Sequence, residues 1–126
     1  NDSIPWVDHQ EFALSLVRDT DRAFFRVDDQ ETGLGVVDLT NIDPAESRAE
    51  LGLYRNPNLS HHLVSGKTVG MVLMGALEAI AQALSISTLW LKVRTNNKRA
   101  IRLYTNMGYR RYGRNDRYYL YEKDLR

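Results

Sequence analysis

The apolar residues between positions 69 and 84 recur with the spacing of an α-helix. Alternating gaps of three and one place them on one stripe, which a helix of 3.6 residues per turn can bury. The members of this stripe are Val69, Val72, Leu73, Ala76, Leu77, Ile80, Ala81 and Leu84. Residues 89–93 then alternate apolar and polar side chains, as a strand with one covered face does. The middle of the chain therefore predicts a buried helix that leads into a β-strand.

Short runs rich in β-branched and aromatic residues predict further strands, because turn-forming residues bound each run. These runs are residues 23–28, 33–39, 50–54, 109–112 and 118–122. Helical spacing also predicts a first helix over residues 7–18, capped by Asp8, and a later one over residues 97–107. The later helix has Thr95 or Asn96 as its cap and Gly108 just beyond its end. The order of elements predicts one α/β domain over residues 1–126 with a mixed sheet.

Composition removes several classes of function. The 126 residues include no cysteine, which excludes disulfides, thiol catalysis and cysteine-based zinc sites. The most apolar stretch, residues 71–84, is too short to span a bilayer, and the first residues lack the features of a secretory signal. We therefore expect a cytoplasmic protein with no membrane partner. The chain begins without methionine, so we also expect it to be part of a longer protein.

Charge is unevenly distributed although the net charge is only +1. Residues 1–64 contain 5 basic and 12 acidic side chains, whereas residues 65–126 contain 12 basic and 4 acidic ones. A basic half indicates an anionic partner, either a nucleic acid or the phosphates of a cofactor. Scattered basic residues can also be no more than a solvated face.

The fragment Gly66-Lys67-Thr68, at the start of the long helix, is similar to the end of a nucleotide-binding P-loop. A P-loop requires another glycine five residues before Gly66, but His61 stands there. The next strand also ends in Arg94, where a Mg²⁺-binding aspartate is needed. A simpler anion site remains, because the first turn of a helix exposes N–H groups and Gly66 and Gly70 leave room beside them.

Gly66-Lys67-Thr68-Val69-Gly70, followed by an amphipathic helix, resembles the pyrophosphate loop of the GNAT N-acetyltransferases. The loop departs from the family pattern at Ser65, which replaces a basic or amide residue, and at Thr68, which replaces a glycine. A second segment, residues 97–109, matches the family pattern N-x-x-A-x-x-L-Y-x-x-x-G-F/Y throughout. The resemblance spans residues 22–124 and leads us to expect that residues 58–65 hold an insertion.

Within the family, the chain looks most like the acetyltransferases of the pseudaminic-acid pathway, which act on a UDP-linked 4-amino sugar in flagellin glycosylation. Residues 51–59, 76–81 and 91–104 carry this likeness. Polyamine and protein N-terminal or ribosomal-protein acetyltransferases share much of it and remain alternatives. The resemblance implies a mostly antiparallel sheet that splays between two central strands, with helices on its faces. The strand and helix that usually open the fold are expected to be missing from this chain.

The resemblance also implies roles for individual residues. The co-substrate would be acetyl-CoA, the acceptor a small-molecule amine, and no metal would be needed. Tyr104 would serve the departing sulfur, and Glu50 is the candidate base. The residues expected to hold the cofactor are Leu53, Tyr54, Ser65, Gly66, Lys67, Thr68, Val69, Gly70, Asn97, Ala100 and Tyr104. A homodimer is a further expectation from the family.

Several residues have two possible interpretations. His9 is a second candidate base, although an exposed histidine near the N-terminus is the simpler interpretation. His61 and His62 lack a third partner for a metal site. Lys98, Arg99 and Arg102 fit the 3′-phosphate of CoA or a solvated helix face, and we favour the solvated face for Arg99.

A nucleic-acid-binding module is the competing class. Residues 92–117 contain nine basic side chains against Asp116 alone, and Tyr104, Tyr109 and Tyr112 are interleaved with them. A pI of about 8.2 and an acidic first half argue against this class. We expect no nucleic-acid partner.

Overall fold

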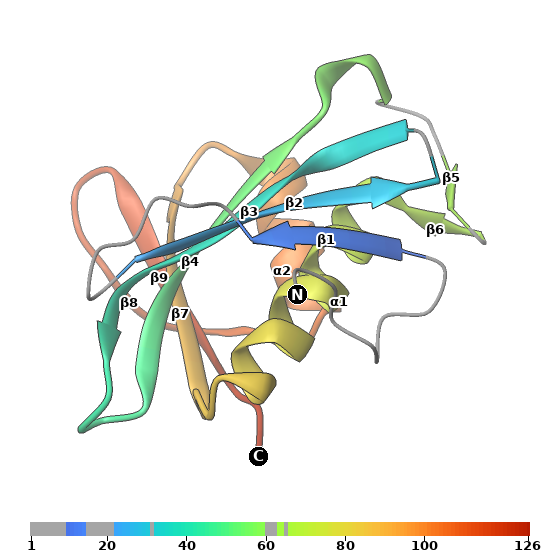
Figure 1. Cartoon of the computed structure of the whole chain (residues 1–126). Helices are drawn as coiled ribbons and strands as arrows, with labels where there is room; N and C mark the ends of the chain where they lie inside the picture. The colour runs from blue at the N-terminus through green and yellow to red at the C-terminus, as the bar shows by residue number, and fades with distance from the viewer. Residues whose placement is uncertain (1–9, 15–21, 31, 60–62, 65) are drawn as a thin grey trace.

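The computed structural model describes residues 10–14, 22–30, 32–59, 63–64 and 66–126. A seven-stranded mixed sheet forms its centre, in the order β1-β2-β3-β4-β7-β9-β8 (Figure 1). The strands are β1 (Gln10–Leu14), β2 (Ala23–Asp29), β3 (Thr32–Asp43), β4 (Arg48–Arg55), β7 (Thr88–Arg94), β8 (Arg110–Arg114) and β9 (Tyr118–Asp124). The β4–β7 pair is parallel and the other neighbouring pairs are antiparallel. The mixed sheet expected from the sequence is therefore confirmed.

The helix α1 (Val69–Ala83) joins β4 to β7 and covers one face of the sheet. The apolar stripe read from the sequence faces the core, where Leu73, Leu77 and Ile80 are fully buried against strand residues such as Val37 and Leu89. Full burial of one such side chain contributes roughly 1.5–3 kcal/mol. Leu84, the last residue of the predicted stripe, caps the helix and is 51% exposed.

The shorter helix α2 (Lys98–Asn106) follows β7. Its cap is Asn97, whose Oδ1 accepts a hydrogen bond of 3.2 Å from the N–H of Ala100, so the cap lies one residue later than Asn96. Gly108 lies just beyond the helix with φ of +93°, a conformation that glycine adopts without strain. This glycine is where the sequence predicts a left-handed residue.

The segment predicted as a first helix is different in the structure. Gln10–Leu14 form β1, which pairs with β2 along its whole length. The rest of the predicted helix lies outside the described residues. In a five-residue segment, apolar spacing does not separate helix from strand, and pairing with the free edge of β2 decides the outcome. β3 also runs further than predicted, to Asp43, with a register shift after Thr40.

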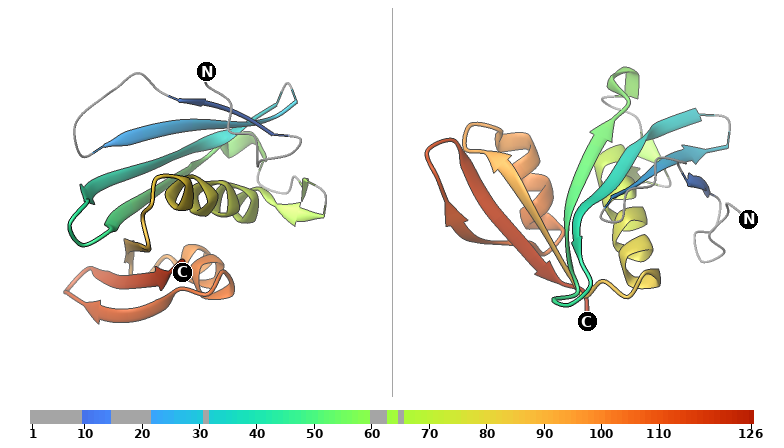
Figure 2. Two further views of the ribbon diagram at one scale, coloured as in Figure 1. Left: turned by 60° about the horizontal axis from the view of Figure 1, so that its bottom comes forward. Right: turned by 60° about the vertical axis from the view of Figure 1, so that its left-hand side comes forward.

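β4 and β7 are joined over only three residue pairs: Arg48 with Thr88, Ala49 with Leu89, and Glu50 with Trp90. Beyond Glu50, β4 continues to pair with β3 and β7 continues to pair with β9. The two central strands therefore part, and Figure 2 shows them converging at one end and opening at the other. This is the splay that the family resemblance implies.

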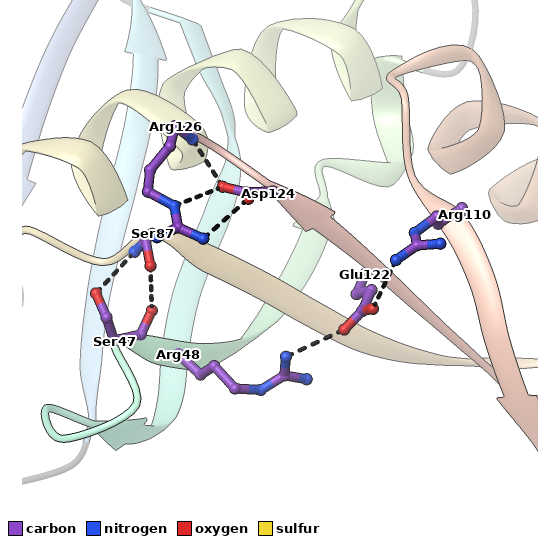
Figure 3. Close-up of polar contacts among 7 residues, drawn as sticks. All are labelled: Ser47, Arg48, Ser87, Arg110, Glu122, Asp124 and Arg126. Atoms are coloured by element: carbon purple, nitrogen blue, oxygen red, sulfur yellow. Dashed lines mark hydrogen bonds and ion pairs between the residues drawn. The ribbon is translucent and has the colours of Figure 1, made fainter.

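The joined end of this V carries a dense set of polar contacts (Figure 3). The N–H of Ser87 donates to Oγ of Ser47 at 3.0 Å, and Oγ of Ser87 donates to the carbonyl of Ser47 at 3.2 Å. Nη1 of Arg48 donates to Oε1 of Glu122 at 3.0 Å and so links β4 to β9 over the intervening β7. These contacts fix the closed end and leave the other end open.

No helix within the described ranges is both long and apolar enough to cross a membrane.

Candidate active site at the open end of the sheet

A cleft of about 400 Å³ lies where the strands part. It is bounded by the end of β4, the first turn of α1 and the length of α2. The residues that line it are Leu53, Arg55, Thr68, Gly70, Met71, Asn97, Arg99, Ala100, Arg102, Leu103, Tyr104 and Asn106. Six of these, Leu53, Thr68, Gly70, Asn97, Ala100 and Tyr104, are among the residues that the sequence nominates for cofactor binding.

The segment before α1 is a small hairpin. β5 (Leu63–Val64) pairs with β6 (Lys67–Thr68), and Gly66 in the connecting turn has φ of +81°. Oγ1 of Thr68 accepts a hydrogen bond of 3.2 Å from the N–H of Met71 and so caps the helix. A helix that begins immediately after a strand has its first turn fixed in place.

The predicted loop residues 66–70 have three different locations. Thr68 and Gly70 line the cleft, whereas Gly66 and Lys67 do not, and Lys67 is exposed. Val69 is 1% exposed and belongs to the core. Ser65 lies outside the described residues, as do His9, His61 and His62.

Gly70 keeps the cleft open at the mouth of α1. A Cβ at this position would lie 3.0 Å from Cδ2 of Leu103 on α2. That distance is shorter than an ordinary van der Waals contact, so a side chain here would push the two helices apart or fill the space between them. The absence of a side chain therefore lets α2 approach the first turn of α1, whose N–H groups attract anions.

Three arginines make the cleft strongly basic. Arg55 stands at the end of β4, and Arg99 and Arg102 stand on α2. Burial lowers the pKa of Arg55, and the nearby charge of Arg99 lowers it further. Because the positive charges of Arg55 and Arg99 act on each other, an anion bound between the two guanidinium groups would be favourable. The sequence suggests no role for Arg55 and favours a solvated face for Arg99. In the structure Arg99 is exposed but lines the cleft, whereas Lys98 does not.

Tyr104 lies on the inner side of α2. Its side chain is 9% exposed and meets the ring of Tyr109 edge to face, with ring centroids 6.1 Å apart. Burial raises the pKa of Tyr104, and the neighbouring phenol of Tyr54 raises it further. A phenol in this setting keeps its proton and can donate it, or a hydrogen bond, to an anion in the cleft.

β4 presents different residues to the two faces of the sheet, because side chains alternate along a strand. Leu53 and Arg55 line the cleft on the face that α1 covers. Tyr54 points to the opposite face, where its side chain is 60% exposed. The backbone at Leu53 and Tyr54 lies beyond the last β4–β7 pair, so it stands beside the opening.

Glu50 belongs to the last β4–β7 pair, opposite Trp90. Its Oε1 accepts a hydrogen bond of 2.8 Å from Nδ2 of Asn41. Glu50 shares the face of Tyr54 and does not line the cleft. The structure thus places the two predicted catalytic residues, Tyr104 and Glu50, on different sides of the sheet, with the opening between them.

Met71, Leu103 and Asn106 also line the cleft and were not nominated as site residues. Met71 comes just after the first motif, Asn106 stands at a variable position of the second, and Leu103 reads from the sequence as a core position. Only the placement of α2 against the start of α1 brings these three together.

Known proteins are similar to this chain in sequence and in fold. A family model described as the acetyltransferase (GNAT) family matches residues 2–109. Acetyltransferase PseH of Campylobacter jejuni is 33% identical over 102 residues, which are 80% of this chain and 59% of PseH. The chain thus spans about three fifths of the length of that curated relative.

Solved structures agree with the sequence matches. The crystal structure of C. jejuni PseH in complex with acetyl coenzyme A has a TM-score of 0.72 and 29% identity, and the match covers 84% of this chain and 70% of PseH. Spermidine/spermine N-acetyltransferase SpeG of Vibrio cholerae has a TM-score of 0.73 at 21% identity over 86% of this chain and 68% of SpeG, a similarity of fold alone. With its splayed sheet, its matched family model and a relative at 33% identity, the chain belongs to the acetyltransferase (GNAT) family.

Proposed function

We propose that the protein transfers an acetyl group from acetyl-CoA to a primary amine, which attacks the thioester directly in a ternary complex. The observation that carries this proposal is the opening between β4 and β7 beside the mouth of α1. The opening gives access to strand backbone from the cleft. Beside it lie a helix terminus and three arginines, which suit a phosphorylated ligand.

The described residues fit such a donor. The first turn of α1, with Gly70, would hold the diphosphate, and Arg55, Arg99 and Arg102 supply positive charge for phosphate groups. The backbone of Leu53 and Tyr54 would hydrogen-bond the amide-bearing arm and the acetyl oxygen. Asn97 and Ala100 would line the same arm, and Gly66, Lys67, Thr68 and Val69 complete the support of the helix mouth. When bound, the donor supplies an activated acetyl group.

Two residues are proposed for the chemistry. Tyr104 donates a proton or a strong hydrogen bond to the departing sulfur, because its raised pKa keeps the phenol protonated. Glu50, on the opposite face, assists the amine through its carboxylate. Both roles depend on the amine approaching from the face of Glu50 and Tyr54 while the donor occupies the cleft.

The proposed acceptor is a UDP-linked 4-amino-4,6-dideoxy sugar. The segments similar to the pseudaminic-acid-pathway enzymes favour this choice, and the relative at 33% identity is named PseH. Polyamines and protein N-termini are the alternatives, and solved structures of spermidine N-acetyltransferases share the fold. A homodimer in the cytoplasm is part of the proposal on the family resemblance alone.

The burial of two of the three tyrosines argues against the nucleic-acid-binding alternative. Tyr104 and Tyr109 are 9% and 3% exposed, so neither ring is free to stack on a base. The more exposed Tyr119 already carries the guanidinium of Arg111 at 4.4 Å from its ring centroid. Tyr112, at 44% exposed, is the remaining candidate of the three that the sequence suggested.

A binding experiment and a product screen test the proposal together. Titration calorimetry should show binding of CoA at micromolar concentration and much weaker binding of CoA that lacks its 3′-phosphate. Mass spectrometry should then detect acetylated product from acetyl-CoA with the UDP-amino sugar, spermidine or a peptide. If CoA does not raise the melting temperature while single-stranded oligonucleotide does, the acetyltransferase proposal is wrong.

A further inference from the structure

Asp38 on β3 is the one charged side chain that the described part of the chain buries, at 3% exposed. It lies on the face of the sheet opposite α1, because the adjacent Val37 and Leu39 point into the core under α1. Burial of a carboxylate lowers the stability of the fold unless hydrogen bonds or an opposite charge compensate for the lost hydration. Neither the binding of the donor nor the proposed role of Tyr104 requires a buried carboxylate at this position.

Gly52 on β4 makes room for the Asp38 carboxyl. The two residues are opposite each other in the β3–β4 register. A Cβ at Gly52 would lie 2.3 Å from Oδ1 and 2.7 Å from Cγ of Asp38, so the carboxyl occupies the space of the missing side chain. Gly52 comes two residues after Glu50, the last β4 residue that pairs with β7. The carboxyl therefore reaches across β4 toward the opening.

Tyr54 connects this carboxyl to the opening. Tyr54 follows two residues after Gly52 on the same face of β4, opposite Val36, and its phenol lies near enough to the Asp38 carboxyl for each group to shift the pKa of the other. The negative charge of Asp38 is the main cause that raises the pKa of Tyr54. Tyr54 is also near enough to Tyr104 to raise the pKa of that buried phenol. Asp38 and Tyr54 thus lie near each other on the outer face of the sheet, and Tyr104 lines the cleft on the other side of the opening.

We propose that Asp38 is the group that takes up the proton of the acceptor amine, with Tyr54 as the positioning residue that orients its carboxylate. This inference rests on the proposed acetyl transfer. The amine nitrogen forms a bond to the acetyl carbon, and the bond from that carbon to sulfur breaks. The proton released by nitrogen goes to Asp38, and the sulfur takes its proton from Tyr104, so charge and protons balance.

The surroundings of Asp38 suit this role. Burial raises its pKa most, and Glu50 raises it further, while the hydroxyl of Tyr54 and the charge of Arg22 lower the pKa. A carboxylate with a raised pKa is a stronger base than an exposed one. Glu50, the residue that the sequence nominates, is partly exposed and its carboxylate already accepts a hydrogen bond from Asn41.

The test compares Asp38→Asn with Glu50→Gln and with Asp124→Asn, an exposed control paired with Arg126 at the far end of the sheet. With acetyl-CoA and the UDP-linked 4-amino sugar, we expect Asp38→Asn to lower kcat/KM about 100-fold and to remove the acidic limb of its pH profile. Affinity for CoA should stay within about twofold in every variant. A larger loss in Glu50→Gln than in Asp38→Asn overturns the proposal.

A second readout needs no substrate. Ultraviolet titration of wild type and Tyr54→Phe isolates the ionisation of Tyr54, and Asp38→Asn should lower the pKa of this phenol. An unchanged pKa contradicts the contact. If Asp38→Asn fails to fold, Gly52→Ala is the second variant. It keeps Asp38 but moves its carboxyl away from β4, and it should also reduce kcat/KM. A wild-type protein that acetylates no amine would refute the proposed function, whereas an active protein with an active Asp38→Asn variant refutes this inference alone.

Discussion

Arg48 and Glu122 meet across a strand to which neither belongs. Nη1 of Arg48 on β4 lies 3.0 Å from Oε1 of Glu122 on β9, and β7 runs between them (Figure 3). Arg110 approaches the other carboxylate oxygen at 3.5 Å. The ion pair lies at the closed end of the V, where β4 and β7 have only three pairs to hold them together. It therefore fixes the angle at which the strands part.

We expect Arg48→Met to destabilise the fold by about 1 kcal/mol, because Glu122 is only partly exposed and loses its main partner. The same change should weaken CoA binding by altering the opening. Urea unfolding and calorimetry measure the two effects. Arg126→Met removes an ion pair with Asp124 that is far more exposed, and it should change neither quantity.

Gly70→Ala should weaken CoA binding by about fivefold, since a 3.0 Å approach to Leu103 amounts to about 1 kcal/mol of overpacking in the cleft. Gly75→Ala is the matched control within α1, because apart from neighbouring residues and the backbone of the helix itself nothing lies within 4 Å of a Cβ there. It should leave binding unchanged and stabilise the helix by about 0.5–1 kcal/mol. Equal CoA affinities in the two variants would contradict the role of Gly70.

Tyr104→Phe should lower kcat about 100-fold and leave the affinity for CoA within about twofold. The pKa of Tyr104 is raised above its usual value near 10, so the phenol stays protonated throughout the range in which the enzyme is assayed. Wild type should therefore keep its rate between pH 8 and about pH 10, because Tyr104 does not ionise in this range. Stopped-flow release of the free thiol at several pH values measures this directly.

The polar cluster behind α1 predicts a dependence of stability on alkaline pH. The hydroxyl of Tyr109 donates to Oε2 of Glu78 at 2.9 Å, and Nζ of Lys123 donates to the same carboxylate at 3.1 Å. Burial raises the pKa of Tyr109 strongly, and the negative charge of Glu78 raises it further. Above about pH 10 the unfolded chain releases this proton and the folded protein does not, so stability falls as pH rises.

Tyr109→Phe should therefore be less stable than wild type at pH 7, by about 1 kcal/mol for the lost hydrogen bond. The difference should shrink above pH 10, since the variant has no proton to release at this position. Thermal melts at pH 7 and above pH 10 compare the two. A constant difference across this range would contradict the raised pKa.

The elements with strong local signals were predictable from sequence. The apolar stripe from Val69 to Ile80 gave the position of α1, and Gly108 marked the end of α2. β1 was not predictable, because five residues carry too little periodicity and the partner strand β2 determines the pairing. The opening between β4 and β7 has no local signature at all and was expected only by family resemblance.

The site divides in the same way. Asn97, Ala100 and Tyr104 belong to a sequence motif, and all three line the cleft. Arg55 lies within a segment that carries the family likeness, but no role follows from it there, and Asp38 lies outside every such segment; each reads as an ordinary polar position at or within a strand. Their significance arises from neighbours that are distant in sequence, such as Arg99 for Arg55. Residue pattern alone cannot supply such neighbours.

The short pairing between β4 and β7 has a consequence for motion. Backbone groups at the tips of these strands lack the hydrogen-bonded partner that the closed end provides, so they should exchange their amide hydrogens with solvent sooner. A ligand that lies in the opening can form hydrogen bonds with the free backbone groups of both β4 and β7. Binding of such a ligand should therefore slow deuterium uptake at residues 51–55, and this measurement needs no catalytic turnover.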